Sequence, residues 1–460
     1  MRERVFVHHA RLDAPPEEVF RWLTRPGALA RLTPGWEPVE FTSADRPLAP
    51  GKRVHLRIPL GPLRLHWVAE HQAGERPLSF RDVQVRGPFP LWEHVHEVQG
   101  LPDGRGSMLE DRVRLRLPFG ALGDRLVWAH VERRLARLFA HRERVLAADL
   151  ARHQELAGVP MKILVSGSSG LVGSALVPFL TTGGHQVERL VRGKPRDERE
   201  IAWDPSRGVA DPARMEGFDA VVHLAGENIA AGRWTTERMR RIQGSRIQGT
   251  KTLCETLARV QRRPAVLVAA SAVGFYGDRG NELLTETSAS GVGFLAELCR
   301  AWEGATAPAA DAGMRVVNLR IGVVLSARGG ALARMLLPFR LGLGGRIGNG
   351  NQFMSWIALD DLVAAIQHTI RSLALAGPVN AVAPNPVSNR EFTRVLAGVL
   401  HRPAIAPLPA FAARTLLGKM AEELLLASQR VVPDRLTAAD FRFRWPDLEG
   451  ALRHVLGRLK

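Results

Sequence analysis

The chain has 460 residues, of which 45% are hydrophobic and 24% charged, so it is too long for one ordinary core and is expected to form two or three domains. Its formal net charge of +17 comes mainly from arginine and is not gathered in a basic tail, so nucleic acid is not an expected partner. No apolar run is long enough for a membrane span, and the amino terminus lacks the apolar region of a secretory signal, so we expect a cytoplasmic protein.

Residues 1–150 alternate short apolar runs with turn sequences, a pattern typical of antiparallel strands. The runs are FVHHARL, VHLRIPL, LRLHWVAEH, LSFRDVQV, LWEHVHEV and MLEDRVRLRLP. A short helix is predicted in APPEEVFRWLT, between the first two strands, and a long amphipathic helix from Asp124 to about Leu150. This first part is therefore predicted to be an α+β domain.

The order of these elements resembles the helix-grip fold of the START-like, polyketide-cyclase-like (SRPBCC) superfamily. In such domains a curved sheet and a long helix enclose an apolar cavity. The resemblance implies a site for a lipophilic small molecule in residues 1–150. The alternative is a filled core that only stabilises or dimerises the protein.

Two histidines of this domain, His94 and His96 in WEHVHEV, are predicted to share one strand face with Trp92. Imidazoles are good metal ligands, but the sequence shows no carboxylate nearby on that face. Alternating polar residues on a half-exposed strand explain both histidines, so we predict no metal site. The two cysteines, Cys254 and Cys299, lack the spacing of a metal or redox motif and are predicted to be buried thiols.

Residues 151–160, ARHQELAGVP, are predicted to be a linker, after which the pattern changes to a βαβ unit. MKILVSGSSGLVGSALVPFLTTGGHQVERLVR predicts a buried strand over 163–165, a glycine-rich turn, a helix, and a second strand over 187–191. In such a unit the glycines permit a tight turn and close approach to a pyrophosphate at the helix amino terminus. The predicted cofactor-binding residues in this turn and after a later strand are Gly167, Ser168, Ser169, Gly170, Leu171, Val172, Gly173, Leu224, Ala225 and Gly226.

The end of the second strand predicts which dinucleotide is bound. An NAD-binding protein usually places Asp or Glu there, whereas this chain has Arg192 followed by Gly193 and Lys194. Positive charge suits a 2′-phosphate, so Arg192 is predicted to select NADP(H). The alternative is that Arg192 is a solvated loop residue in an arginine-rich protein.

Further buried strands are predicted within 219–229, 264–278 and 314–326, alternating with helical segments, so the fold class is an α/β doubly wound parallel sheet. The phrases GSSGLVG, HLAGENI, SAVGFYG, GFLAELCRAWE and NGNQFMSWIALDDL resemble the extended short-chain dehydrogenase/reductase, or NAD-dependent epimerase/dehydratase, superfamily. More closely, they resemble its atypical YfcH-like, epimerase-family branch. The likeness spans about 161–458 and implies a Rossmann domain over 161–390 and a DUF1731-like module over 391–460.

That superfamily normally combines a serine or threonine with Tyr-x-x-x-Lys, in which the lysine lowers the tyrosine pKa for proton transfer. Tyr276 is the only tyrosine, and Gly280 follows it by four residues, so the motif is absent. The usual tyrosine and lysine positions fall on apolar or thiol residues, namely Phe294 or Leu295 and Leu298 or Cys299. Ser271 and Tyr276 are therefore the candidate catalytic residues, with Glu297 as another candidate acid or base.

Polar residues beyond the predicted strand ends are the candidates for substrate contacts. They are Asn228, Arg233, Arg320, Gln352 and Trp356. Two functions remain open at this point. One is an atypical NADP(H)-binding reductase or epimerase-like protein acting on a small lipophilic or sugar-like molecule, and the other is a nonenzymatic NADP(H)-dependent sensor or scaffold.

Overall fold

The computed structural model describes residues 2–37, 39–41, 49–60, 63–118, 120–156, 158–209 and 211–459. They fall into two compact units. The N-terminal unit comprises Met1–Val159 with Pro178–His185, and the C-terminal unit comprises Pro160–Val177 with Gln186–Lys460. Among the described residues, no helix is both long and apolar enough to cross a membrane.

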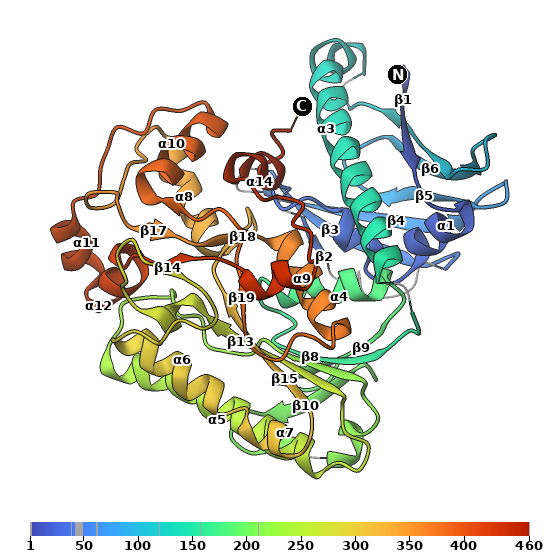
Figure 1. Ribbon diagram of the computed structural model, residues 1–460. Helices are drawn as coiled ribbons and strands as arrows, with labels where there is room; N and C mark the ends of the chain where they lie inside the picture. The colour runs from blue at the N-terminus through green and yellow to red at the C-terminus, as the bar shows by residue number, and fades with distance from the viewer. Residues whose placement is uncertain are drawn as a thin grey trace. The chain divides into compact units, whose positions relative to one another are not determined.

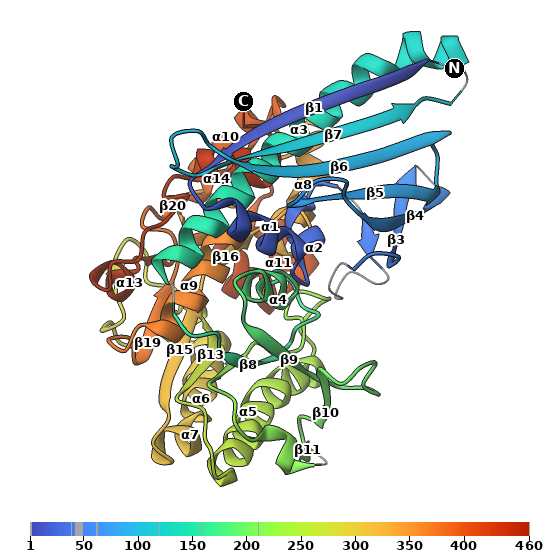
Figure 2. The same cartoon turned by 90° about the vertical axis from the view of Figure 1, so that its right-hand side faces the viewer.

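The N-terminal unit is built on a seven-stranded antiparallel sheet with the order β1-β7-β6-β5-β4-β3-β2. Its strands are β1 (Glu3–Leu12), β2 (Glu40–Phe41), β3 (Arg53–Leu60), β4 (Leu63–Ala73), β5 (Ser79–Arg86), β6 (Leu91–Gly100) and β7 (Ser107–Arg116). Two short helices, α1 (Pro16–Thr24) and α2 (Ala28–Leu32), follow β1, and the long helix α3 (Gly120–Glu155) follows β7. Figure 2 shows β1, β7 and β6 side by side with α3 running along them. This is the predicted helix-grip arrangement.

Apolar side chains from α1 and α3 fill one part of the space against the sheet. Trp22 is fully buried and packs in one cluster with Leu12, Val19 and Leu146. Helix α3 continues to Glu155, so the first residues of the predicted linker are helical. This stretch contains good helix formers, and Arg152 forms an ion pair with Glu155 at 3.0 Å one turn later.

The C-terminal unit contains an eight-stranded sheet with the order β11-β10-β9-β8-β12-β13-β15-β19. The strands are β8 (Lys162–Ser166), β9 (Gln186–Val191), β10 (Glu200–Asp204), β11 (Gly208–Val209), β12 (Ala220–His223), β13 (Val266–Ala272), β15 (Arg315–Ile321) and β19 (Gly377–Ala381). All pairs except β10–β11 are parallel. The strand order reverses between β8 and β12, which is where a doubly wound sheet binds its ligand.

Helices cover both faces of this parallel sheet. In Figure 1, α5 (Thr236–Arg259) and α6 (Phe294–Gly304) lie on one side and α9 (Leu359–Arg371) on the other. Leu253 and Leu257 of α5 pack against Leu164, Val221 and Leu267 of the central strands. The predicted doubly wound fold is confirmed. The predicted strands within 187–191, 219–229, 264–278 and 314–326 are present, whereas β10 and β19 had not been predicted.

The last part of the chain packs against the parallel sheet and contributes one strand to a separate two-stranded sheet. Its helices are α10 (Asn389–Leu400), α11 (Ala410–Leu417), α12 (Lys419–Ala421), α13 (Asp434–Ala438) and α14 (Leu448–Val455). Between α12 and α13, β21 (Arg430–Val431) pairs with β14 (Leu283–Leu284). The Asp361 carboxylate of α9 accepts hydrogen bonds from the backbone N–H groups of Arg444 and Trp445 at 3.0 and 2.9 Å. These bonds fix the carboxyl-terminal segment to the sheet domain.

Candidate functional site

The glycine-rich turn after β8 is too crowded for side chains at two of its glycines. Gly167 has φ +68°, and a Cβ there would lie 2.6 Å from the carbonyl carbon of Leu224. A Cβ on Gly173 would lie 2.3 Å from the carbonyl oxygen of Gly167. The first glycine therefore permits the turn beside β12, and the third permits α4 (Gly173–Thr182) to begin against it. This cradle has the form that a dinucleotide pyrophosphate requires.

A buried polar chain connects the carboxyl ends of the two central strands. Ser166 Oγ lies 2.7 Å from His223 Nδ1, and His223 Nε2 lies 3.0 Å from Thr250 Oγ1. The Leu224 N–H donates to Ser166 Oγ at 3.2 Å. Burial lowers the pKa of His223 to about 4, so the imidazole is neutral at physiological pH. The hydrogen bonds among Ser166, His223 and Thr250 hold the start of the Leu224–Gly226 segment beside the glycine turn. The sequence patterns do not predict this role.

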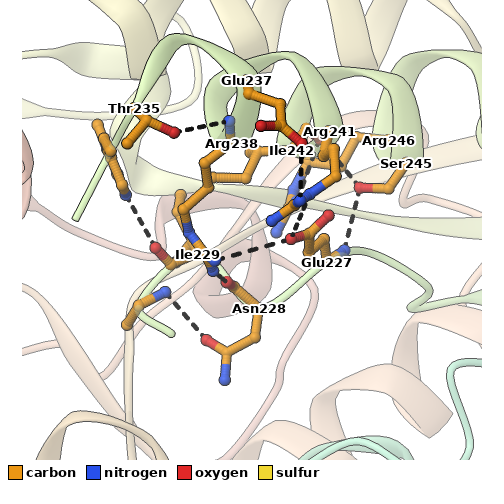
Figure 3. Close-up of polar contacts among 12 residues, drawn as sticks. Glu227, Asn228, Ile229, Thr235, Glu237, Arg238, Arg241, Ile242, Ser245 and Arg246 are labelled. Carbon is orange, nitrogen blue, oxygen red and sulfur yellow. Dashed lines mark hydrogen bonds and ion pairs between the residues drawn. The ribbon is translucent and has the colours of Figure 1, made fainter. Parts of the chain in front are cut away.

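The loop after β12 is attached to α5, as Figure 3 shows. The Glu227 N–H donates to Ser245 Oγ at 3.0 Å, and the Glu227 carboxylate accepts a hydrogen bond from Arg241 at 3.3 Å. Arg238 donates to the backbone oxygen of Asn228 at 2.6 Å. The Asn228 side chain accepts from the N–H of Ala230 at 3.0 Å, and the residue is exposed. The loop is thus held in one conformation at the ligand-binding edge of the sheet.

Arg246 brings a positive charge against the Gly226 backbone. A Cβ on Gly226 would lie 3.1 Å from Arg246 Cζ, and the guanidinium also lies over the Trp302 ring, 5.0 Å from its centroid. Burial lowers the pKa of Arg246 from its usual value. The sequence patterns did not single out Arg246, although it lies on α5 facing the HLAG phrase.

The predicted specificity residue Arg192 directly follows β9, the strand that pairs with β8, and its side chain is exposed. Lys194, two residues later, is exposed as well. Both cations therefore lie at the strand end where a Rossmann fold places the adenosine ribose.

The candidate catalytic residues belong to one buried hydrogen-bond network at the ends of β13 and β15. Ser271 Oγ donates to Glu303 at 2.7 Å, and the Arg320 guanidinium makes two bonds to the Glu303 carboxylate at 2.8 and 2.9 Å. Arg320 also donates to the Tyr276 hydroxyl at 2.9 Å, and that hydroxyl donates to Asn380 Oδ1 at 2.8 Å. The structure thus joins three predicted residues and adds two partners that the sequence patterns did not indicate.

This network differs electrostatically from a tyrosine–lysine pair. Burial raises the pKa of Tyr276 and Arg320 opposes that rise, so the phenol stays protonated at neutral pH. Tyr276 is 0% and Ser271 3% exposed, and both hydroxyl groups already have protein partners. Cys299, one of the two residues considered for the lysine position, is buried with its pKa raised to about 12. Glu297 is exposed on α6.

The remaining substrate candidates do not share one environment. Gln352 is buried and donates to the backbone oxygens of Ile347 and Leu425, both at 3.0 Å. Trp356 is fully buried, and its indole N–H donates to the Asn385 oxygen at 3.1 Å. These two side chains hold the carboxyl-terminal segment together, because a buried donor needs a partner. By contrast, Arg233 is exposed beside Gly418, like the exposed Asn228.

The interpretation of His94 and His96 as residues of a half-exposed strand is wrong. Each is only 7% exposed, and both lie beside the carboxylates of Asp82 and Asp111. Antiparallel pairing brings these residues together: Asp82 lies opposite His94 and Asp111 opposite His96. The pattern of a single strand does not reveal these carboxylates, because they belong to neighbouring strands and only the register brings them beside the histidines. Both cysteines, in contrast, are buried free thiols as predicted.

The parallel sheet, its glycine cradle and the polar chain behind it define a dinucleotide-binding protein of the short-chain dehydrogenase/reductase type. Residues 163–381 match the model of the NAD dependent epimerase/dehydratase family, residues 408–455 match the DUF1731 model, and residues 12–143 match polyketide cyclase / dehydrase and lipid transport. An epimerase family protein of Mycobacterium bovis is 43% identical over 64% of this chain and 98% of its own length. The chain belongs to this epimerase family.

Two solved structures are similar to this chain in three dimensions. A nucleoside-diphosphate sugar epimerase from Corynebacterium glutamicum is 36% identical, with a TM-score of 0.80 over 99% of this chain and 90% of its own. The human epimerase family protein SDR39U1, solved with NADPH, is 34% identical, with a TM-score of 0.60 over 65% of this chain and 100% of its own. The first similarity covers both units, and the second covers about the length of the epimerase-like part.

Proposed function

We propose that this protein binds NADP(H) and acts as an atypical reductase or epimerase on a small molecule that is lipophilic or sugar-like. The main observation behind this proposal is the cradle around Gly167 and Gly173, where neighbouring backbone atoms occupy the space that a side chain would need. Arg192 and Lys194 at the end of β9 favour the 2′-phosphate of NADP(H) over NAD(H). The human relative was solved with NADPH, which supports the same choice.

The nicotinamide cofactor supplies hydride chemistry, and a protein group must then move the accompanying proton. Ser271 and Tyr276 are the proposed proton-handling groups, and Arg320 with Glu303 fixes their positions. Without a lysine, the Tyr276 phenol is a weak acid. A reaction that demands only modest acid catalysis fits this site better than one that needs an ionised tyrosine.

A second function, an NADP(H)-dependent sensor or scaffold, is favoured by the burial of the same residues. Ser271 donates to Glu303, and Tyr276 donates to Asn380, so neither hydroxyl is free for substrate without a rearrangement. In this function the nucleotide stabilises one conformation by mass action. The N-terminal unit, whose matching family model includes lipid transport, is proposed to hold a lipophilic ligand in either case.

Native mass spectrometry of the gently purified full chain tests the cofactor assignment. We expect one NADP(H) per chain, whereas retention of NAD(H) alone would contradict the role of Arg192. NADPH oxidation with panels of aldehydes, ketones and nucleotide sugars then separates the two functions. Turnover that disappears in Ser271→Ala supports the enzyme, and tight NADPH binding without turnover supports the sensor.

A further inference from the structure

A row of ionisable side chains crosses four neighbouring strands in the sheet of the N-terminal unit. His71 of β4 lies opposite Asp82 of β5, Asp82 lies opposite His94 of β6, and His96 of β6 lies opposite Asp111 of β7. Directly opposed residues of antiparallel strands point to the same face of the sheet. That face is the one covered by α3, because the His94 ring stands edge-on to Phe139 with centroids 5.3 Å apart. The row is therefore enclosed between sheet and helix.

The distances within the row are those of directly interacting groups. His94 Nε2 and His96 Nδ1 lie 2.9 and 2.7 Å from the same oxygen of Asp111. His96 Nε2 lies 3.7 Å from Asp82, whose other oxygen lies 3.0 Å from His71 Nδ1. The two imidazole rings on β6 have centroids only 3.8 Å apart. Two histidines and two carboxylates thus converge on one small volume.

Three of these residues have the chemistry and spacing of metal ligands. One ligand atom from each of Asp82, His94 and His96 lies within 4.8 Å of the other two. Two ligands on one ion are separated by at most about 4.4 Å, because bonds from nitrogen or oxygen to Zn²⁺ are about 2.0–2.2 Å long. A contraction of a few tenths of an ångström completes the site, which rotation of Asp82, the least buried of the three, can supply.

Charged side chains surround these ligand atoms. Asp82 and Asp111 are two carboxylates, and Arg142 of α3, which lies over the Phe139 ring at 5.0 Å, is a cation beside them. His96 Nδ1 is buried and lies 2.7 Å from the Asp111 carboxylate. A carboxylate behind an imidazole is the usual support of a metal-binding histidine, because it fixes the ring that binds the ion through its other nitrogen.

We infer that Asp82, His94 and His96 bind a divalent first-row transition-metal ion, and that Asp111 is the carboxylate that orients both imidazoles. Two imidazoles and one carboxylate suit Zn²⁺ or Fe²⁺ and leave at least one coordination position for water or an oxygen of a bound ligand. The proposed lipophilic-ligand domain would then contain a metal centre of its own, independent of the dinucleotide site.

The test is isothermal titration of the chelator-stripped full chain with ZnCl₂, checked by metal analysis after gel filtration. We expect one Zn²⁺ per chain. Asp82→Asn, His94→Gln and His96→Gln should each weaken binding by about 100-fold or more, and Asp111→Asn by about 10–100-fold, as for other orienting partners of metal-binding histidines. His66→Gln, an exposed histidine on β4, is the matched control and should bind as the wild type does.

Co²⁺ provides an independent readout, because the position and intensity of its visible d–d absorption report its coordination number and geometry. Folding of each variant is checked by circular dichroism. If the variants of the more buried histidines fail to fold, the metal affinity of Asp82→Asn is the test. The inference is overturned if folded wild-type protein binds no stoichiometric Zn²⁺. It is equally overturned if Asp82→Asn binds Zn²⁺ and Co²⁺ as the wild type does.

Discussion

The Arg320 guanidinium donates a hydrogen bond to the Tyr276 hydroxyl at 2.9 Å, inside a network from which solvent is excluded. Tyr276→Phe would leave Arg320 and Asn380 each without one partner. Loss of a buried hydrogen bond of this kind costs about 1–3 kcal/mol, so we expect that loss of unfolding free energy in urea denaturation. Loss of NADPH turnover with this loss of stability but intact folding would assign the phenol to catalysis. Unchanged turnover would leave Tyr276 a structural role only.

Glu303 is the acceptor that neutralises Arg320 in this network. Glu303→Gln keeps the shape of the side chain but leaves a buried guanidinium without its counter-ion, because Arg320 is only 3% exposed. Removing one partner of a buried pair costs about 3–5 kcal/mol, so we expect a large fall in the urea midpoint. Glu297→Gln on the exposed face of the same helix is the control and should leave the midpoint unchanged. Equal stability of both variants would contradict the importance of the Glu303–Arg320 pair.

The crowding around Gly167 predicts that NADPH affinity depends strongly on this glycine but not on Gly244. Gly167→Ala forces a side chain into a residue with φ +68° and against the Leu224 backbone, so we expect NADPH affinity to fall by about tenfold or more. Gly244→Ala on α5 meets nothing within 4 Å and should leave affinity unchanged while slightly raising stability. Fluorescence titration with NADPH measures both. Full affinity in Gly167→Ala would place the cofactor elsewhere.

Arg192 is expected to strengthen the binding of NADPH but not that of NADH. A charged hydrogen bond to a 2′-phosphate contributes about 1.5–3 kcal/mol, so Arg192→Ala should weaken NADPH binding by about 10–100-fold and leave NADH binding nearly unchanged. Arg259→Ala, an exposed arginine near the end of α5, is the matched control for a change of net charge. Parallel losses for NADPH and NADH in Arg192→Ala would remove the proposed selectivity.

His223 predicts a pH dependence of the C-terminal unit. Burial lowers its pKa to about 4 in the folded protein, below the value of about 6.5 expected for an unfolded chain. The unfolded chain therefore binds the proton more readily than the folded protein does. The contribution of His223 to the free energy of unfolding is fully present above about pH 6.5, and it falls by about 3 kcal/mol as the pH drops towards 4. Hydrogen exchange of β8 and β12 between pH 7.5 and 4.5 measures this fall.

His223→Gln is the variant that isolates this contribution, because glutamine hydrogen-bonds but does not titrate in this range. We expect its stability in β8 and β12 to change less with pH than that of the wild type. An identical pH dependence in both proteins would assign the acid sensitivity to other groups.

Local patterns in the sequence predict most of the fold because strand and helix periods are local properties. The glycine turn and the strands on either side of it are examples, since each lies within a few residues of its neighbours. β10 had not been predicted, because it is short and its pairing with β9 becomes visible only in the sheet. The same limit applies to β19, which pairs with β15 although more than fifty residues with two helices lie between them in the chain.

The candidate sites contain contacts that local sequence patterns cannot predict. Ser271 lies at the end of β13 and Tyr276 follows that strand closely in the chain, so a motif comparison finds them. Glu303, which binds Ser271, lies 32 residues further on, and no spacing rule predicts that contact. The carboxylates beside His94 and His96 could have been found by pairing the predicted strands as hairpins. That step requires the register, which depends on turns between strands rather than on the strands themselves.

The row from His71 to Asp111 has a consequence for how the N-terminal sheet assembles. Each residue reaches the enclosed face only in the observed register, and a shift of one residue on β6 would turn both histidines towards the opposite face. Such a slip would remove both histidines from Asp111 and leave Asp82 with His71 as its imidazole partner. The row therefore adds to the free-energy cost of a one-residue slip of β6.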